Sequence, residues 1–181
     1  MSGSASGAVL CRNEIKKLLS TGELKIEPMP DETAFGPASV DLTLHNEFRV
    51  FKNHGLDVVE VSEGVDFNEF TEKVTLAEGE KLLLLPGCAC LAITRETVSL
   101  PKNLAGMLEG RSRFARLGLS VHVTAGFISP GVSNRTVLEI FNCSPLALHL
   151  IPGVRICQFV FFSVQGDAEP YSGRFVNQHH L

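Results

Sequence analysis

The sequence has no long apolar run and no cluster of basic residues. Its apolar stretches are only a few residues long, whereas a membrane-spanning helix needs roughly 20 apolar residues. With 16 Lys and Arg against 20 Asp and Glu, the net charge is −4, so the broad positive surface that duplex DNA requires is missing. We therefore expect neither a membrane nor a nucleic acid as partner, while a small anionic ligand needs only a few well-placed cations.

The cysteines are few and irregularly spaced. The first ten residues, MSGSASGAVL, also lack the basic flank and apolar core of a secretory signal peptide. An odd number of cysteines without regular spacing does not resemble a secreted disulfide framework. We expect a cytoplasmic protein whose thiols act as small apolar groups; they are Cys11, Cys88, Cys90, Cys143 and Cys157.

The length of 181 residues predicts a single domain over residues 1–181. Apolar residues recur at helical spacing over residues 9–20, so we expect one short helix that ends at Thr21–Gly22. From Ser39 onward the apolar pattern has a period of two. Strands are expected over residues 39–44, 81–86, 90–96, 104–110, 119–125, 136–142, 146–151 and 155–162. Many short strands with Gly and Pro breaks predict an all-β sandwich or barrel.

The two ends of the chain are polar. Residues 1–8 are small and polar and predict a flexible lead-in. Residues 52–72 predict a loop-rich insertion with at most one strand, and residues 166–181 predict a mobile arm.

One apparent metal motif can be set aside. His45 and Glu47 form an H-x-E, and Cys88 and Cys90 lie shortly after Pro86. Zinc deaminases combine H-x-E with P-C-x-x-C at helix starts. Here the cysteines are spaced C-x-C and the surrounding pattern is that of strands, so we expect no zinc site.

Residues 110–118 concentrate positive charge. Arg111, Arg113 and Arg116 lie within six residues, together with Ser112 and flanking glycines. Arginine binds phosphate in a bidentate manner and stays charged at any working pH. The segment is either a phosphate-binding loop or a solvated charged turn.

Glu139 is an acidic residue within an apolar strand. Alternation places Val137, Glu139 and Phe141 on one face, with Leu138 and Ile140 on the other. If the face of Glu139 is buried, desolvation favours the protonated carboxyl group and makes it a candidate proton shuttle. Otherwise it is an ordinary exposed strand residue. His122 and His149, in alternating stretches of their own, are interpreted as structural or solvent-facing.

Several motifs in this order resemble the dCTP deaminase family of the dUTPase-like superfamily. They are LCRNEIKKLLSTGELKIEP, ASVDLTL, EGRSRFARLGLSVHVTAGFISPG, TVLEIFN, IPGVRICQFVF and GRFVNQ. The resemblance implies a distorted β-barrel or jelly roll with a short N-terminal helix, assembled as a homotrimer with active sites between subunits. It also implies zinc-independent hydrolysis of dCTP to dUTP and ammonia, with Mg²⁺ accompanying the triphosphate and dTTP as a candidate inhibitor.

The resemblance also assigns roles to residues. Glu139 would be the general base and acid, Ser112 would hold the water or the amine, and Arg116 would position Glu139. The remaining matches would bind phosphates, base and sugar, or belong to a C-terminal flap at 166–181. They are Arg111, Arg113, Phe114, Ala115, Val123, Thr124, Ala125, Ser129, Val137, Leu138, Gln158, Tyr171, Arg174 and Gln178.

The chain departs from the family pattern after residue 125. Gly126 and Phe127 resemble the bifunctional deaminases that also hydrolyse dUTP, but Ser129 stands where those enzymes carry an aspartate. Serine is a much weaker base. Two alternatives therefore stay open: a bifunctional enzyme that yields dUMP, and a nucleotide-binding relative without chemistry.

Overall fold

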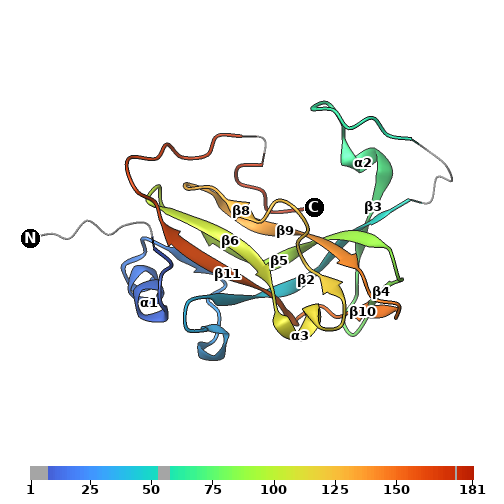
Figure 1. Cartoon of the computed structure of the whole chain (residues 1–181), viewed down its shortest axis with the longest axis horizontal. Coiled ribbons are helices and arrows are strands. Elements are labelled where there is room, and N and C mark those ends of the chain that lie inside the picture. Colours follow the sequence, from blue (N-terminus) through green and yellow to red (C-terminus); the bar gives the residue numbers. More distant parts are fainter. Residues whose placement is uncertain (1–7, 53–57, 174) are drawn as a thin grey trace, which may run out of the picture.

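The computed structural model describes residues 8–52, 58–173 and 175–181, most of whose regular structure is β-strand (Figure 1). The predicted lead-in, apart from Ala8, and the predicted flap residue Arg174 lie outside these residues. The helical elements are α1 (Arg12–Thr21), the 3-10 helix η1 (Glu32–Ala34), α2 (Phe67–Phe70) and α3 (Ser112–Ala115). The strands are β1 (Lys25–Glu27), β2 (Val40–Phe51), β3 (Thr71–Thr75), β4 (Leu82–Leu84), β5 (Ala89–Ser99), β6 (Leu104–Gly110), β7 (Leu119–Ser120), β8 (Phe127–Ile128), β9 (Ser133–Asn142), β10 (Leu148–Leu150) and β11 (Arg155–Ser163).

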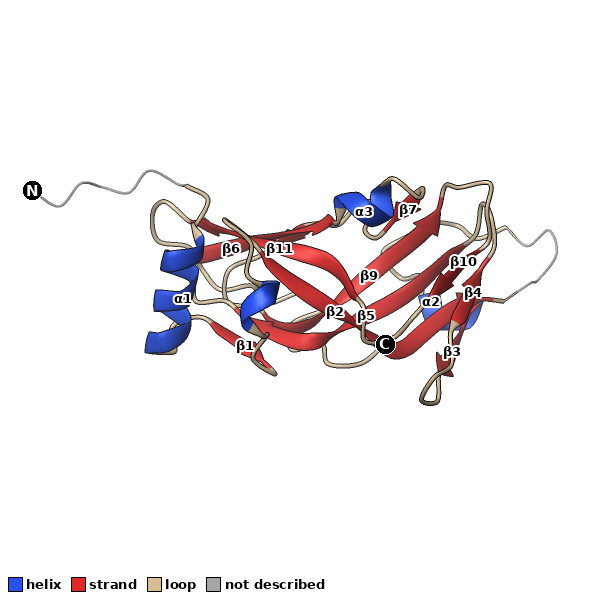
Figure 2. Cartoon of the chain, turned by 90° about the horizontal axis from the view of Figure 1, so that it is seen from below, coloured by secondary structure: helices blue, strands red, loops and turns tan. Residues whose placement is uncertain are grey.

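Antiparallel pairing joins nine of these strands into one curled sheet. Its order is β7-β9-β5-β2-β11-β6-β8, with β1 paired to β5 and β3 paired to β2, while β4 and β10 form a separate pair. Figure 2 shows how the long strands bend across one another to form a half-barrel. The predicted all-β, barrel-like fold with a short N-terminal helix is confirmed.

Register shifts help the sheet to curl. The ladder between β2 and β5 slips between Leu44 and Phe48, and the ladder between β5 and β9 slips between Ile93 and Thr97. Such irregularities bend strands and increase their twist. The core is formed by fully buried side chains, among which the Phe159 and Phe161 rings lie 4.8 Å apart.

The N-terminal helix closes one end of the sheet. Ile15 is fully buried against the core, and the helix ends at Gly22, which adopts a left-handed conformation with φ of 76°. Glycine tolerates this conformation because it has no Cβ. The predicted helix and its stop are therefore confirmed.

The strand predicted over residues 119–125 is mostly wrong. β7 ends at Ser120, because it pairs only with the last residues of β9. Beyond it the chain turns across the sheet, and the Thr124 N–H donates to a carboxylate rather than to a neighbouring strand. His122 therefore lies in a loop, whereas His149 is in β10 and exposed as expected.

Candidate functional site

The half-buried face of β9 faces a cavity. Along this strand Leu138 and Ile140 are fully buried in the core. Val137 and Glu139 alternate with them, are only half-buried, and line the cavity. The strand therefore presents a carboxylate to a cavity while its opposite face anchors it in the core.

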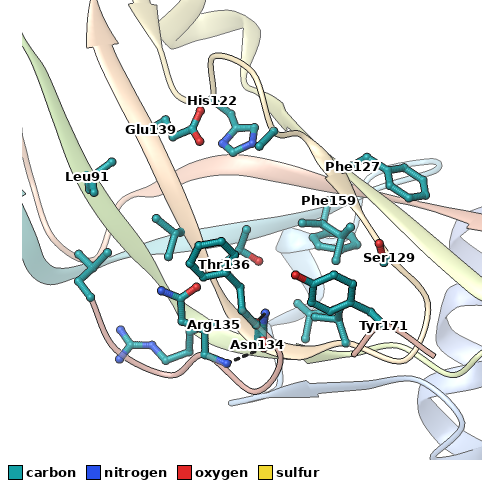
Figure 3. Close-up of a pocket in the computed structure, with 18 of the residues that line it drawn as sticks. Leu91, His122, Phe127, Ser129, Asn134, Arg135, Thr136, Glu139, Phe159 and Tyr171 are labelled. Carbon is teal, nitrogen blue, oxygen red and sulfur yellow. Dashed lines mark hydrogen bonds between the residues drawn. The ribbon is translucent and has the colours of Figure 1, made fainter. Parts of the chain in front are cut away.

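The cavity has a volume of about 520 Å³ and is mainly apolar (Figure 3). Its walls come from β5, β8, β9, β11 and the loop after β7. Phe51, Phe67, Tyr171 and the C-terminal segment, residues 175–181, complete them. A concave apolar cavity with a few polar groups is typical of small-molecule sites. Among the residues predicted to bind nucleotide, it brings together Ala125, Ser129, Val137, Glu139, Tyr171 and Gln178.

Two hydrogen bonds orient the Glu139 carboxylate. Its Oε2 accepts from the Thr124 backbone N–H at 3.3 Å and from the Thr124 hydroxyl at 3.1 Å. Both donors come from the loop that replaces the predicted strand. Among the described residues no group donates to Oε1, so this oxygen can meet a ligand or a water molecule in the cavity.

His122 lies at the same end of the cavity as Glu139 (Figure 3). Both of its ring nitrogens are buried without a hydrogen-bond partner among the described residues. Buried polar atoms normally have partners, so the ring is suited to meeting a polar ligand. The sequence interpretation of His122 as a structural or solvent-facing residue missed its place in the cavity.

Residues 110–118, called the arginine segment here, do not line this cavity within one chain. Arg111 precedes α3 and its guanidinium is engaged, because it pairs with Asp41 at 2.9 Å and donates to the Arg155 carbonyl at 2.8 Å. Burial raises the pKa of the Asp41 carboxyl, although Arg111 and Arg155 oppose that shift. Ser112, Arg113, Ala115 and Arg116 are exposed and Phe114 is half-buried, and none of them lines the cavity.

Gln158 also belongs to the arginine side. It lies on β11, donates to the Gly110 carbonyl at 3.1 Å and accepts from the Ser39 hydroxyl at 3.1 Å. The structure therefore separates the predicted site residues into two groups. Glu139 and its neighbours line the cavity, while Gln158 and the arginine segment lie outside it.

Pro170 and Tyr171, which precede the C-terminal segment at residues 175–181, lie along one side of the cavity. The Tyr171 backbone N–H donates to the Pro130 carbonyl at 2.9 Å, and its side chain faces the cavity beside Ser129 (Figure 3). A Cβ at Gly131, where φ is 79°, would approach the Pro170 Cβ to 2.5 Å. A glycine is thus needed where the chain at Pro170 crosses the strand connection.

Two further groups around the cavity had no clear sequence signal. Asn134 and Arg135, at the start of β9, line it and bind the C-terminal segment. Two predicted nucleotide-binding residues do not line the cavity, since Val123 is exposed and Leu138 is buried in the core.

Metal-binding groups are sparse in the described part of the chain. Among those residues no three His, Cys, Asp or Glu side chains gather where they could hold a metal ion. Cys90 and Cys157 are buried, and burial raises the pKa of the Cys90 thiol to about 12, whereas the other three cysteines are exposed.

None of the described helices has the length and apolar character to cross a membrane.

Comparison with known proteins gives consistent results. The family model described as dCTP deaminase-like matches residues 9–164. A dCTP deaminase from Tolumonas auensis is 42% identical over 91% of this chain and 89% of its own length. A protein from Methanobrevibacter smithii named dCTP deaminase, dUMP-forming, is 40% identical over 91% of this chain and 85% of its own length.

A solved structure shares the fold. The crystal structure of 2'-deoxycytidine 5'-triphosphate deaminase from Agrobacterium tumefaciens superimposes with a TM-score of 0.68 at 23% identity. The match covers 87% of this chain and 49% of that one, so this chain spans about half its length. On the family match and these relatives, the chain belongs to the dCTP deaminase-like family.

Proposed function

We propose that the protein hydrolyses dCTP to dUTP and ammonia without zinc. The observation that carries the proposal is the Glu139 carboxylate, held by Thr124 at the wall of a largely apolar cavity of about 520 Å³. Relatives at about 40% identity that are named dCTP deaminases support the same reaction class.

The proposed chemistry begins with water. Glu139 would take a proton from a water molecule as its oxygen attacks C4 of cytosine, which gives a tetrahedral intermediate. The carboxyl group would pass this proton to N3. It would then take the proton of the new C4 hydroxyl and deliver it to the exocyclic amine, which leaves as ammonia as the C4 carbonyl forms. The overall balance is dCTP plus water to dUTP plus ammonia.

The remaining predicted residues have proposed roles in binding. Ser112 and Arg116 would come from a neighbouring copy in a homotrimer, Ser112 to hold the water or amine and Arg116 to position Glu139. This part is motivated by their exposure and their distance from the cavity within one chain. Residues 166–181 would act as a flap over the nucleotide.

Mg²⁺ is proposed to arrive with the nucleotide. The described residues offer no cluster of carboxylates for the ion, and Mg²⁺ in nucleotide sites is often held largely by phosphates and water. The lack of such a cluster among the described residues fits an ion that is held by the triphosphate and neutralises its charge.

The decisive experiment is turnover of dCTP by the wild type and by Glu139→Gln. The substitution keeps the volume but removes the base, so ammonia release should fall by roughly 10²–10⁴-fold. Glu72→Gln, which changes an exposed glutamate on β3, is the matched control and should retain activity. Binding of dCTP by calorimetry without any product would instead support a non-catalytic nucleotide-binding protein.

A second candidate is a bifunctional enzyme that releases dUMP. The dUMP-forming relative and Gly126 favour it. A Cβ at Gly126 would lie 3.2 Å from the Leu108 carbonyl oxygen, so a larger residue would require the loop or its neighbour to shift by a few tenths of an ångström. Ser129 weighs against it, because a serine in the cavity cannot replace a carboxylate base. Incubation with dCTP, CTP and dUTP in parallel, with ammonia and pyrophosphate measured separately, distinguishes the two.

A further inference from the structure

The C-terminal segment, residues 175–181, folds back on the first residues of β9. The Asn134 side-chain amide donates to the Phe175 carbonyl at 2.7 Å and accepts from the Gln178 backbone N–H at 2.7 Å. The Arg135 backbone N–H donates to the Gln178 carbonyl at 3.0 Å. Phe175, Gln178 and Leu181 thereby become part of the cavity wall.

The Arg135 side chain joins three parts of the molecule. Its Nε donates to the Thr94 carbonyl of β5 at 2.8 Å. Its Nη1 donates both to Glu47 Oε1 of β2 at 3.0 Å and to the His179 carbonyl at 3.1 Å. The side chain is only 11% exposed, so the guanidinium forms a fixed link from the sheet to the C-terminal segment. Figure 3 shows Asn134 and Arg135 at the end of the cavity away from Glu139.

Glu47 holds the guanidinium in place. Its side chain is 10% exposed and contacts Lys73 at 2.6 Å, His45 at 3.3 Å and His180 at 3.7 Å. Burial alone would raise the pKa of Glu47, but hydrogen bonds from Lys73 and Arg135 lower it to about 2. The carboxylate is therefore ionised near neutral pH, and moving Arg135 away would leave a buried charge short of a partner.

We infer that Arg135, held by Glu47, is a positioning residue that fixes the C-terminal segment over the cavity and so sets the affinity for the nucleotide. The effect on affinity rests on the proposed function, whereas the docking of the segment does not. Since the segment forms a wall of the cavity, its release would expose bound nucleotide to water. The contribution is to binding, so it should change KM more than kcat.

The test compares Arg135→Gln and Glu47→Gln with Arg95→Gln, which alters an exposed arginine of β5. Hydrogen exchange followed by mass spectrometry reports on the amides of residues 175–181. Fluorescence anisotropy gives a second, independent measure, because the chain has one tyrosine and no tryptophan. Its ultraviolet emission therefore reports on Tyr171, in the same C-terminal region.

We expect exchange of the segment to be about tenfold faster in both variants, as for a locally opened region, with lower Tyr171 anisotropy. The KM for dCTP should rise about tenfold while kcat stays within about twofold. Arg95→Gln should behave as the wild type. If circular dichroism shows that Arg135→Gln is unfolded, Arg135→Lys provides the same readouts, since it keeps a charge near Glu47 but loses the fork that reaches His179.

Unchanged exchange and anisotropy in a folded Arg135 variant would overturn the inference, because the backbone contacts alone would then hold the segment. An unchanged KM would overturn its second part. If the wild type does not turn over dCTP but Arg135→Gln releases the segment, the proposed function is wrong and the docking role of Arg135 is supported. If the wild type turns over dCTP but Arg135→Gln leaves the segment in place, the proposed function is supported and the docking role is wrong.

Discussion

Two singly inactive variants should restore activity when they assemble together. Glu139 lines the cavity, whereas Arg116 is exposed just after α3 and does not line it. If each active site combines the cavity of one copy with the arginine segment of the next, Glu139→Gln damages one half of a site and Arg116→Met the other. A mixed assembly then contains sites in which both halves are intact.

The size of this effect follows from the arrangement. In an equal mixture, an intact site needs its cavity from the Arg116 variant and its arginine segment from the Glu139 variant. Random assembly in a closed ring of three makes that about one quarter of all sites, and about one third once the assemblies of a single variant are removed. Loss of the general base alone leaves roughly 1% of activity or less, so the mixed sample should exceed the Glu139 parent by at least about 25-fold.

The assay is ammonia release from dCTP by co-expressed variants carrying different tags, purified over both tags in succession. The matched control is a mixture of Glu139→Gln with Glu139→Ala, which damages the same half twice and should stay at the parental level. Verified mixed assemblies with no more activity than their parents would refute the reasoning, because Arg116 of one copy would then not complete the site of another.

Three further changes have defined outcomes. Thr124→Val removes the hydroxyl that lies 3.1 Å from Glu139, and kcat should fall about tenfold; Thr124→Ser should restore it, and an unchanged kcat in the valine variant would show that this hydroxyl does not orient the base. The pKa of Glu47 is lowered from 4.5 to about 2, so its stabilising effect is present above pH 4.5 and is lost as the pH falls towards 2. Over this pH range the free energy of unfolding measured in urea should fall by about 3 kcal/mol more in the wild type than in Glu47→Gln. Parallel pH profiles of the two proteins would contradict the lowered pKa of Glu47. Ser129→Asp returns a carboxylate to the cavity wall and should add pyrophosphate release to ammonia release, whereas pyrophosphate release by the wild type would argue for the bifunctional enzyme.

The sequence predicts the strand that carries Glu139 well, because a period of two is a local property. Residues 136–142 lie within β9, and of the two faces left open by the pattern, the one with Leu138 and Ile140 is fully buried. The half-burial of Glu139 depends on what covers the other face. Beside Glu139 that cover comes from the loop after β7, whose Thr124 donates to the carboxylate from 15 positions earlier in the chain.

The same alternation gave a wrong strand over residues 119–125. A strand also requires a partner with free hydrogen-bonding groups, and beyond Ser120 the loop donates to the Glu139 side chain. The ion pair between Glu47 and Arg135 could not be predicted from the sequence for a related reason. The two residues are 88 positions apart, and each is simply a charged residue in a strand until the curled sheet brings them together.

The arginines of residues 110–118 and the Glu139 carboxylate do not neutralise each other within one chain. Arg111 is committed to Asp41, whereas Arg113 and Arg116 are exposed and form no ion pair with other described residues. Within one chain, Glu139 therefore has only the Thr124 hydroxyl and amide as donors among the described residues. In the proposed trimer the cations would reach the site from a second copy together with the triphosphate that they bind. The proposed trimer would thus bring together a carboxylate and a set of arginines that lie apart within one acidic chain.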